Sequence, residues 1–492
     1  MKFYTNIYCN GSNILCREIS NGVRKDDVDL FSASLFIPTD KNTTKKTIDF
    51  KNVEEITFNS TYEIQEFKNT YDNVASFDIH GDIGVEYQYI ANNYGNEFDY
   101  DFNQLKTLYI DIETTCDDGF PEILNPTEKV IAVTCMINNA KTVFCLGQFE
   151  STDSNTEVMV YEDEKELLYD LISYFQNEKP DIITGWNIRF FDIPYLVNRI
   201  RFFEDSELSY KKLSPWNIVK EKKVTKGEKE HTIYELVGIS TLDYYELYKT
   251  FTYTNQESYK LDHIAWVELG ERKISYSEYD NISDFYKNNF QKFIEYNIKD
   301  VELVERLEQK MKLMELAVAL AYSAGVNFND VFSQVRTWDV IIYNHLRKKN
   351  IVVPPKKKSD KDNQYAGAYV KEPIVGMHNW VVSFDISSMY PSTIMQYNIS
   401  PETLVEQYDI HLSVLDIISS SKEVDAFYKM MVDNNLSITA NGTCYTKTKH
   451  GFLPELMDKM YKDRKTFKKE MLGAKKRLEE INEELKRRGL KT

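Results

Sequence analysis

Apolar and polar residues alternate along positions 108–113 of this chain. Leu108, Ile110 and Ile112 alternate with Tyr109, Asp111 and Glu113, so a strand here places the two sets on opposite faces. The two carboxylates then lie about 7 Å apart, at roughly 3.4 Å per residue. Like charges this close are costly unless a cation neutralises them, and divalent cations prefer oxygen ligands. The pattern predicts a metal-binding strand, and a solvated edge strand is the alternative.

A second acidic position begins a predicted helix. Residues 181–184 form a short apolar strand, the turn Gly-Trp-Asn follows at 185–187, and a helix is expected from Asp192 because Pro194 suits a first helical turn. Asp192 is a candidate ligand. An N-terminal cap is the commoner role for an aspartate there, although that role leaves the Gly-Trp-Asn turn unexplained.

A third acidic position lies within a long helical pattern. Tyr296 and Asp300 are four residues apart and therefore share one helix face. The alternative is a buried tyrosine beside a solvated acid. Three such segments in one chain favour a shared acidic site, and two cations about 3.5 to 4 Å apart are a known arrangement for phosphodiester cleavage.

The three segments resemble the exonuclease motifs of the proofreading domains of family B DNA polymerases, and most of all the T-even-type phage replicative group. The motifs are Asp-Ile-Glu-Thr-Thr at 111–115, Thr-Gly-Trp-Asn at 184–187 with Asp-Ile-Pro-Tyr at 192–195, and Tyr-Asn-Ile-Lys-Asp at 296–300. The resemblance implies a ribonuclease H-like 3′ to 5′ exonuclease domain with two Mg²⁺ or Mn²⁺ ions.

The resemblance also implies a role for each site residue. Asp111 would bridge both ions, Glu113 and Asp300 would hold the first, and Asp192 would serve the second. Tyr296 would position the attacking water. Asn187 and Phe191 would contact the terminal nucleotide by hydrogen bonding and stacking, although either can be local structure.

A further motif begins at Phe384 and runs to Ile394, and it resembles the first palm motif of the same polymerases. The apolar run from Trp380 towards Phe384 predicts a buried strand that delivers Asp385, a candidate metal ligand, to a turn. Backbone amides at Ser388 and Met389 are candidates for binding triphosphate oxygens. The resemblance implies that Tyr390 lies under the incoming sugar and excludes a 2′-hydroxyl. An ordinary turn is the alternative for Tyr390.

Two other segments resemble parts of these polymerases. Tyr365 and Gly367 lie in a Tyr-Ala-Gly-Ala-Tyr segment similar to the one that follows single-stranded template between the two active sites, and a plain strand is its alternative. Arg464 and Lys468 share a face of a helix similar to the first fingers helix, where such a pair binds the incoming triphosphate. A solvated helix with ion pairs is the alternative.

Two elements of the family do not occur in this sequence. They are the second fingers helix, with its Lys-(x)3-Asn-Ser-x-Tyr-Gly pattern, and the Asp-Thr-Asp-Ser hairpin that supplies the other catalytic aspartate. We therefore expect either a truncated product or the amino-terminal chain of a split polymerase. In the second case a partner chain supplies the rest of palm and fingers and the thumb, since exposed tips tolerate interruption.

The organisation expected is multidomain, α/β and α+β. It comprises a strand-rich N-terminal domain at 1–106, the exonuclease domain at 107–312, a helical return to the N-terminal domain at 313–353, a linker and partial palm at 354–450, and the first fingers helix at 451–492. A β-hairpin is also predicted around Gly227, between Lys222 and Tyr234. The resemblance suggests that this hairpin helps part primer from template, and an ordinary surface hairpin is its alternative.

The composition of the chain limits the kinds of partner and the location that we expect. The formal net charge of −17 argues against general nucleic-acid binding, although residues 451–492 hold 13 Lys and Arg against 8 Asp and Glu. No apolar run approaches the ~20 residues of a membrane span, no signal peptide is evident, and no Cys-x-x-Cys pair indicates zinc. Primer-template DNA, single-stranded DNA and deoxynucleoside triphosphates are the expected partners. A sliding clamp is a candidate, and the host cytoplasm is the expected location.

The leading hypothesis is the amino-terminal part of a DNA-directed DNA polymerase, with a complete exonuclease site and half of a nucleotidyl-transfer site. A non-catalytic DNA-binding subunit that docks a catalytic partner is the alternative, and intact nuclease motifs argue against it. A stand-alone proofreading nuclease leaves Asp385 and Tyr390 unexplained.

Overall fold

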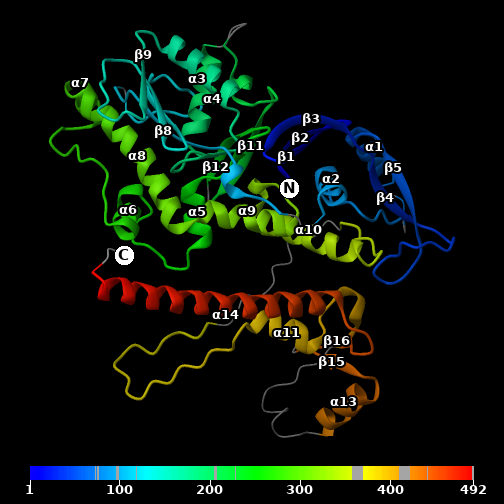
Figure 1. Cartoon of the computed structure of the whole chain (residues 1–492). Coiled ribbons are helices and arrows are strands. Elements are labelled where there is room, and N and C mark those ends of the chain that lie inside the picture. Colours follow the sequence, from blue (N-terminus) through cyan, green and yellow to red (C-terminus); the bar gives the residue numbers. More distant parts are fainter. Residues whose placement is uncertain are drawn as a thin grey trace. The chain divides into compact units, whose positions relative to one another are not determined.

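The computed structural model of this chain describes residues 1–71, 74, 77–95, 99–117, 119–203, 208–227, 229–356, 370–408, 422–439 and 441–489. These residues form two compact units (Figure 1). The first unit comprises 1–35, 55–77 and 82–344, and the second comprises 36–54, 78–81 and 345–492. No helix in the described ranges is long and apolar enough to span a membrane.

A six-stranded mixed sheet forms the centre of the first unit. Its strands, in spatial order, are β13 (Ser240–Thr241), β10 (Ile182–Thr184), β6 (Thr107–Thr114), β7 (Val130–Ile137), β8 (Ala140–Cys145) and β9 (Thr156–Val160). Strand β6 runs parallel to β10 and antiparallel to β7. Because β6 is an interior strand, the edge-strand interpretation of Asp111 and Glu113 is wrong.

Helices pack on both faces of this sheet. On one face, Leu108, Ile110 and Ile112 of β6 share a core with α3 (Glu164–Glu178) and α4 (Asp192–Phe202). On the other face, residues of β7 and β8 share a core with α7 (Ile282–Asn288) and α8 (Phe290–Met311). The alternation along β6 therefore directs its acidic residues towards α8.

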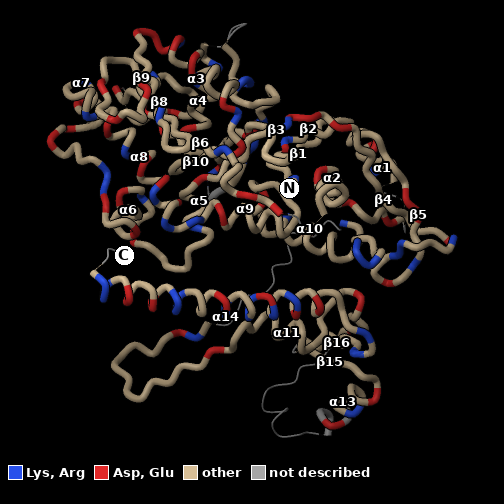
Figure 2. The backbone as a smooth tube through the Cα atoms, viewed as in Figure 1, with Lys and Arg blue, Asp and Glu red and all other residues tan. Residues whose placement is uncertain are grey.

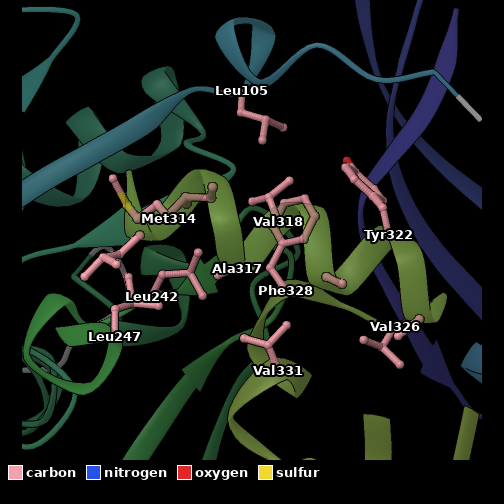
Figure 3. Packing of buried hydrophobic residues seen from close by; sticks show 14 of the residues in the cluster. Leu105, Leu242, Leu247, Met314, Ala317, Val318, Tyr322, Val326, Phe328 and Val331 are labelled. Atoms are coloured by element: carbon pink, nitrogen blue, oxygen red, sulfur yellow. The ribbon is translucent and has the colours of Figure 1, made fainter. Parts of the chain in front are cut away.

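The amino-terminal strands belong to the same unit and pack against a later helix. Strands β1 (Lys2–Asn10), β2 (Asn13–Ser20) and β3 (Val23–Leu30) form an antiparallel sheet, and helix α9 (Leu313–Ala324) contributes to the same core. Figure 3 shows Met314, Ala317, Val318 and Tyr322 of α9 within this packing. The hydroxyl of Tyr322 donates to the Tyr4 carbonyl oxygen at 2.6 Å.

The remaining elements of the first unit connect these layers. They are α1 (Thr61–Tyr71), α2 (Val85–Asn93), α5 (Tyr244–Phe251), α6 (Leu261–Leu269), most of α10 (Gln334–Arg347), and the hairpin of β11 (Val219–Lys226) with β12 (Lys229–Leu236). The hairpin prediction is confirmed, since Lys226 pairs with Lys229 and Gly227 has the positive φ of +66° that such a turn requires. Strands β4 (Ala33–Pro38) and β5 (Val53–Phe58) form a separate two-stranded sheet.

The second unit holds the palm-like and fingers-like sequence. Strands β14 (Leu404–Gln407), β16 (Thr443–Thr446) and β15 (Leu436–Ile438) form a small antiparallel sheet. Helix α11 (Met389–Tyr397) packs along α14 (Phe452–Arg487), and α13 (Lys422–Asp433) lies near β15. Figure 2 shows basic and acidic positions interspersed along α14.

The prediction of a buried strand leading to Asp385 is wrong. Trp380 is 98% exposed, Phe384 is 92% exposed, and neither belongs to a strand. An apolar run becomes a buried strand only where neighbouring elements cover it, and no strand in the described part of the chain pairs with it. The expected turn after Asp385 is present at Ser387 and Ser388.

Candidate active site

The first two candidate ligands come from strand β6. Its residues alternate between buried and half-buried, with Asp111 and Glu113 on the half-buried side. One oxygen each of Asp111, Glu113 and Asp300 lies within 4.8 Å of the other two. Packing of α8 on β6 thus brings Asp300 next to Asp111 and Glu113, which lie at least 187 positions away in the sequence.

Asp192 approaches β6 from helix α4. The backbone N–H of Ile112 donates to Asp192 Oδ1 at 3.1 Å, and Asp192 is the first residue of α4. The cap position of this helix is occupied by Phe191, which has no side-chain hydrogen-bonding group. The carboxylate of Asp192 is therefore directed to the acidic strand, and the cap interpretation does not describe it.

Helix α8 supplies Tyr296 and Asp300 on one face, as its spacing predicted. Asp300 is 3% exposed, so the interpretation as a solvated acid is wrong. Its Oδ1 atom is buried and has no hydrogen-bond partner among the described residues. A buried carboxylate oxygen without a donor is costly, and a bound cation would satisfy it.

The acids strongly affect one another. Burial, then the charges of Asp300, Asp192 and Glu113, raise the pKa of Asp111 well above its usual range. Burial and the charge of Asp300 raise the pKa of Glu113 to about 8. Burial raises the pKa of Asp192 to about 7, although the Ile112 N–H opposes this rise. The cluster is therefore short of positive charge.

Lys273 lies in the loop between α6 and α7 and partly neutralises the cluster. Its ammonium group forms an ion pair with Asp300 and donates to the Tyr296 hydroxyl at 2.9 Å. Burial still raises the pKa of Asp300 to about 6, because desolvation exceeds the effect of Lys273. Lys273 could not be predicted from the sequence, since a single lysine in a polar loop carries no periodic signal.

Asn297 is a second residue that sequence analysis missed, although it lies inside the third motif. Its side-chain amide donates to Asp111 Oδ2 at 2.7 Å. The Thr134 hydroxyl hydrogen-bonds Asn297 Oδ1, which fixes the orientation of the amide. Its position next to Tyr296 in the third motif is the feature of the sequence that could have indicated a role in the site.

The donor set fits a divalent cation that prefers oxygen. Among the residues that the structure describes, four carboxyl groups converge, one buried oxygen lacks a donor, and neither cysteine nor histidine takes part. These properties suit Mg²⁺ or Mn²⁺ better than zinc.

A cavity of about 980 Å³ lies over the carboxylates. Asn187 and Phe191 both line it, and so do Tyr296 and Lys273. Contact of Asn187 and Phe191 with a terminal nucleotide stays a prediction. Asn187 has a positive φ of +69°, which the Gly-Trp-Asn turn requires. The ring of Phe191 packs 5.7 Å from that of Phe120, a cavity residue that sequence analysis missed.

In the second unit, the palm and fingers candidates partly converge. Ser388 and Met389 lie at the start of α11, whose first backbone N–H groups have no partner within the helix. Arg464 Nη1 donates to Ser388 Oγ at 2.9 Å. Asp385 and Tyr390 are exposed beside this turn, and Lys468 is exposed on α14. Tyr365 and Gly367 lie outside the described residues.

Comparison with known proteins assigns these features to a family. Residues 44–264 match DNA polymerase family B, exonuclease domain, and residues 330–488 match DNA polymerase family B.

The chain belongs to the family B DNA polymerases.

Relatives of this polymerase chain include phage and eukaryotic enzymes. It is 34% identical over 440 residues to the DNA-directed DNA polymerase of Escherichia phage RB69, covering 82% of this chain and 47% of the relative. It is 29% identical over 508 residues to that of Enterobacteria phage T4, covering 98% and 55%. The DNA polymerase delta catalytic subunit of Schizosaccharomyces pombe is 25% identical over 385 residues, covering 75% and 34%.

The chain spans about half the length of the phage relatives. Family membership confirms the predicted multidomain α/β organisation with a ribonuclease H-like exonuclease domain, which is the six-stranded sheet with helices on both faces. It also implies that the exonuclease domain uses divalent metal. The five domain boundaries and the roles of individual residues stay predictions.

Proposed function

We propose that this polymerase chain is a metal-dependent exodeoxyribonuclease that removes nucleotides from the 3′ end of single-stranded DNA. The observation that carries the proposal is the convergence of Asp111, Glu113 and Asp300 within 4.8 Å, with a buried Asp300 oxygen to which no group in the described part of the chain donates. Asp111, Glu113, Asp192 and Asp300 would hold two Mg²⁺ or Mn²⁺ ions. When bound, such ions stabilise the charge that develops on phosphate during hydrolysis.

The remaining site residues orient the reactants. The Tyr296 hydroxyl accepts a hydrogen bond from Lys273, so its own proton points elsewhere and is available to orient the attacking water. Lys273 also offers positive charge beside the scissile phosphate. Asn187 and Phe191 line the same cavity and would hold the terminal nucleotide by hydrogen bonding and stacking.

The test is hydrolysis of a 5′-labelled single-stranded oligonucleotide with Mg²⁺. Progressive shortening from the 3′ end is expected, with no hydrolysis in excess chelator. The Asp111→Ala, Glu113→Ala double variant should lose at least about 10³-fold in rate, while an Asp27→Ala, Asp40→Ala variant, which removes two exposed acids, should match the natural chain. Equal rates for the two double variants would overturn the proposal. If the labelled 5′ nucleotide is released first, hydrolysis starts at the 5′ end and the proposed 3′ to 5′ direction is wrong.

A second activity is favoured by the hydrogen bond between Arg464 and Ser388. The Arg464 guanidinium donates to the side chain of Ser388, the residue before the first turn of α11, and a deoxynucleoside triphosphate would bind beside this turn. We propose that Asp385 would be one ligand of the catalytic metal there, Tyr390 would contact the sugar, and Lys468 would add positive charge. Primer-template DNA would be the co-substrate, in the cytoplasm of the host cell.

The apolar run from Ile374 to Phe384 is exposed, which supports the proposal that further polypeptide covers this half of the nucleotidyl-transfer site. Val375 is 94% exposed and Trp380 is 98% exposed, which a stable palm core would cover. We propose a second chain, with the remaining palm, fingers and thumb, as the cover. A sliding clamp is the candidate partner for processive synthesis.

Mixing this chain with a candidate partner chain should produce primer extension that neither shows alone. Arg464→Ala should lower the extension at limiting triphosphate more than Lys475→Ala, a control on the exposed far part of α14. Extension by this chain alone would overturn the need for a partner.

A further inference from the structure

A buried aspartate outside the three acidic motifs joins two segments beside the cavity. Asp243 is 0% exposed and is the residue before the first turn of α5. Its Oδ1 accepts hydrogen bonds from the backbone N–H groups of Asn187 and Tyr245, both at 3.0 Å, and its Oδ2 accepts one from the Arg189 N–H at 2.9 Å. Two of these three donors belong to the turn that follows β10.

A role as a helix cap does not explain this aspartate. The cap of α5 uses only the Tyr245 N–H, and a serine or asparagine would serve there as well without a charge. Burial raises the pKa of Asp243 to about 6, although the N–H groups of Arg189 and Asn187 oppose the rise. The carboxyl group is therefore largely ionised at neutral pH. A buried charge costs more than a neutral cap, so its second oxygen must offset that cost at the turn.

The backbone of this turn has a conformation that needs support. Asn187 has a φ of +69°, in the left-handed region that residues other than glycine seldom adopt. The Phe190 and Phe191 N–H groups both donate to the Asn187 carbonyl oxygen at 3.2 Å. Asp243 accepts from Asn187 itself and from Arg189, two residues later, and so fixes the backbone on both sides of the peptide groups that set this conformation.

The segments on either side of the turn have other supports. Before the turn, the Tyr244 N–H donates to the Gly185 carbonyl oxygen at 2.9 Å, a bond that uses no side chain. After the turn, Asp192 is held by the Ile112 N–H and belongs to the buried helix α4. The loss of the Asp243 carboxylate should therefore disturb residues 186–190 and leave the metal-binding carboxylates in place.

We propose that Asp243 is a positioning residue for the exonuclease reaction, which holds the Asn187 side chain in the orientation that binds the terminal nucleotide. The inference rests on the proposed exonuclease function and adds to it a residue outside the three motifs. Asn187 lines the cavity, whereas Asp243 is fully buried, so it acts on the nucleotide only through Asn187. Binding of Mg²⁺ does not depend on it.

The test replaces Asp243 by serine, which keeps a cap for α5 but is too short to hold the turn. The substrate is a 12-nucleotide oligothymidylate, and thymidine 5′-phosphate serves as a competitive inhibitor that occupies the terminal site alone. KM and the inhibition constant should each rise by about 3- to 10-fold, the effect of one hydrogen bond. The kcat and the Mg²⁺ concentration for half-maximal rate should stay within about twofold, because uniform binding alone is lost.

A double-mutant cycle separates positioning from structural support. Asn187→Ala alone should raise KM by a similar factor, and the Asp243→Ser, Asn187→Ala variant should have the KM of Asn187→Ala, because nothing remains for Asp243 to position. Effects that multiply would indicate a structural role only. Asp163→Ser is the matched control, since the exposed Asp163 caps α3 through the Lys165 N–H and should change neither constant.

The outcomes are distinct. The inference is overturned if KM is unchanged in folded Asp243→Ser or in Asn187→Ala, if the two effects multiply, or if kcat falls at constant KM. If Asp243→Ser does not fold, Asp243→Asn replaces it, because its amide presents a donor to the Arg189 N–H. If the natural chain hydrolyses nothing with Mg²⁺, the proposed function fails instead. Fluorescence anisotropy of the labelled 12-mer in chelator then tests Asp243, and equal affinity of natural and variant chains would reject the inference.

Discussion

The side-chain amide of Asn297 donates a hydrogen bond to Asp111 Oδ2 at 2.7 Å, joining positions 186 residues apart. Thr134 holds the other end of the amide, so the donor faces the carboxylate. The carboxylate of Asp111 is thereby oriented from a neighbouring helix and not only by its own strand.

Replacing Asn297 by alanine should lower the exonuclease kcat by about 10- to 100-fold, because groups that orient metal ligands typically have effects of that size. The Mg²⁺ concentration for half-maximal rate should rise, while KM for the oligonucleotide changes little. Thr134→Val should show the same direction with a smaller effect. An unchanged Mg²⁺ dependence in Asn297→Ala would show that the amide does not orient the ligand.

The ion pair between Lys273 and Asp300 predicts a stability effect that depends on chelation. In excess chelator at neutral pH, Lys273→Met leaves a buried carboxylate without its counter-charge and should lower the free energy of unfolding by about 3 kcal/mol. The Lys273→Met, Asp300→Asn double variant should recover most of this loss in urea unfolding. If the two changes add without recovery, the residues are not coupled.

The raised pKa values of the acids predict how pH acts on the chelated protein. The folded pKa values of Glu113, Asp192 and Asp300, at about 8, 7 and 6, exceed ordinary values near 4, so the folded state binds protons more tightly. The acidic cluster should therefore reduce the free energy of unfolding as pH rises from about 4 to about 8. Urea unfolding of the natural chain and of Asp111→Asn, Glu113→Gln measures the difference, expected to exceed about 1 kcal/mol.

Added Mg²⁺ should reverse this loss, since a cation replaces the protons that leave. The stabilisation by Mg²⁺ should grow with pH in the natural chain and stay small in the Asp111→Asn, Glu113→Gln variant. Equal stabilisation at pH 5.5 and pH 8 would contradict the assignment of the acids as metal ligands.

Arg17 on β2 predicts a large effect far from the acids. It is 3% exposed and donates to the carbonyl oxygens of Lys179, Pro180 and Gly238 at 2.6 to 2.8 Å, and it pairs with Asp26. Arg17→Met should lower the free energy of unfolding by about 3 to 5 kcal/mol, because it leaves these carbonyl oxygens and Asp26 without their charged donor. Arg306→Met, which breaks an exposed pair with Glu271, should cost no more than about 1 kcal/mol. Comparable losses in urea unfolding would show that Arg17 is not a structural link.

The acidic positions could be predicted from sequence because each lies in a segment whose period is local. Alternation along β6 places Asp111 and Glu113 on one face, and the four-residue spacing places Tyr296 beside Asp300. Lys273, Asn297 and Arg17 could not be predicted in this way. Each acts through a partner in another segment, and no short-range pattern specifies which loop or helix will lie opposite.

The run from Trp380 to Phe384 also shows what a local sequence pattern cannot predict. Its composition is that of a buried strand, yet these side chains are exposed, because burial depends on which elements cover a segment. A local pattern gives the tendency of a segment to be covered and not the cover itself.

The sequence alone determined the periodic elements, the order of the acidic motifs and the family, because backbone geometry ties side-chain direction to residue spacing. Tertiary structure decided the rest of the site. Packing of α8 on β6 brings Asp111, Glu113 and Asp300 together, and α4 adds Asp192. Asp243 joins the Gly-Trp-Asn turn to the start of α5 beside the same cavity. Such contacts between distant segments arise only when the whole core is assembled, since no single segment contains both partners.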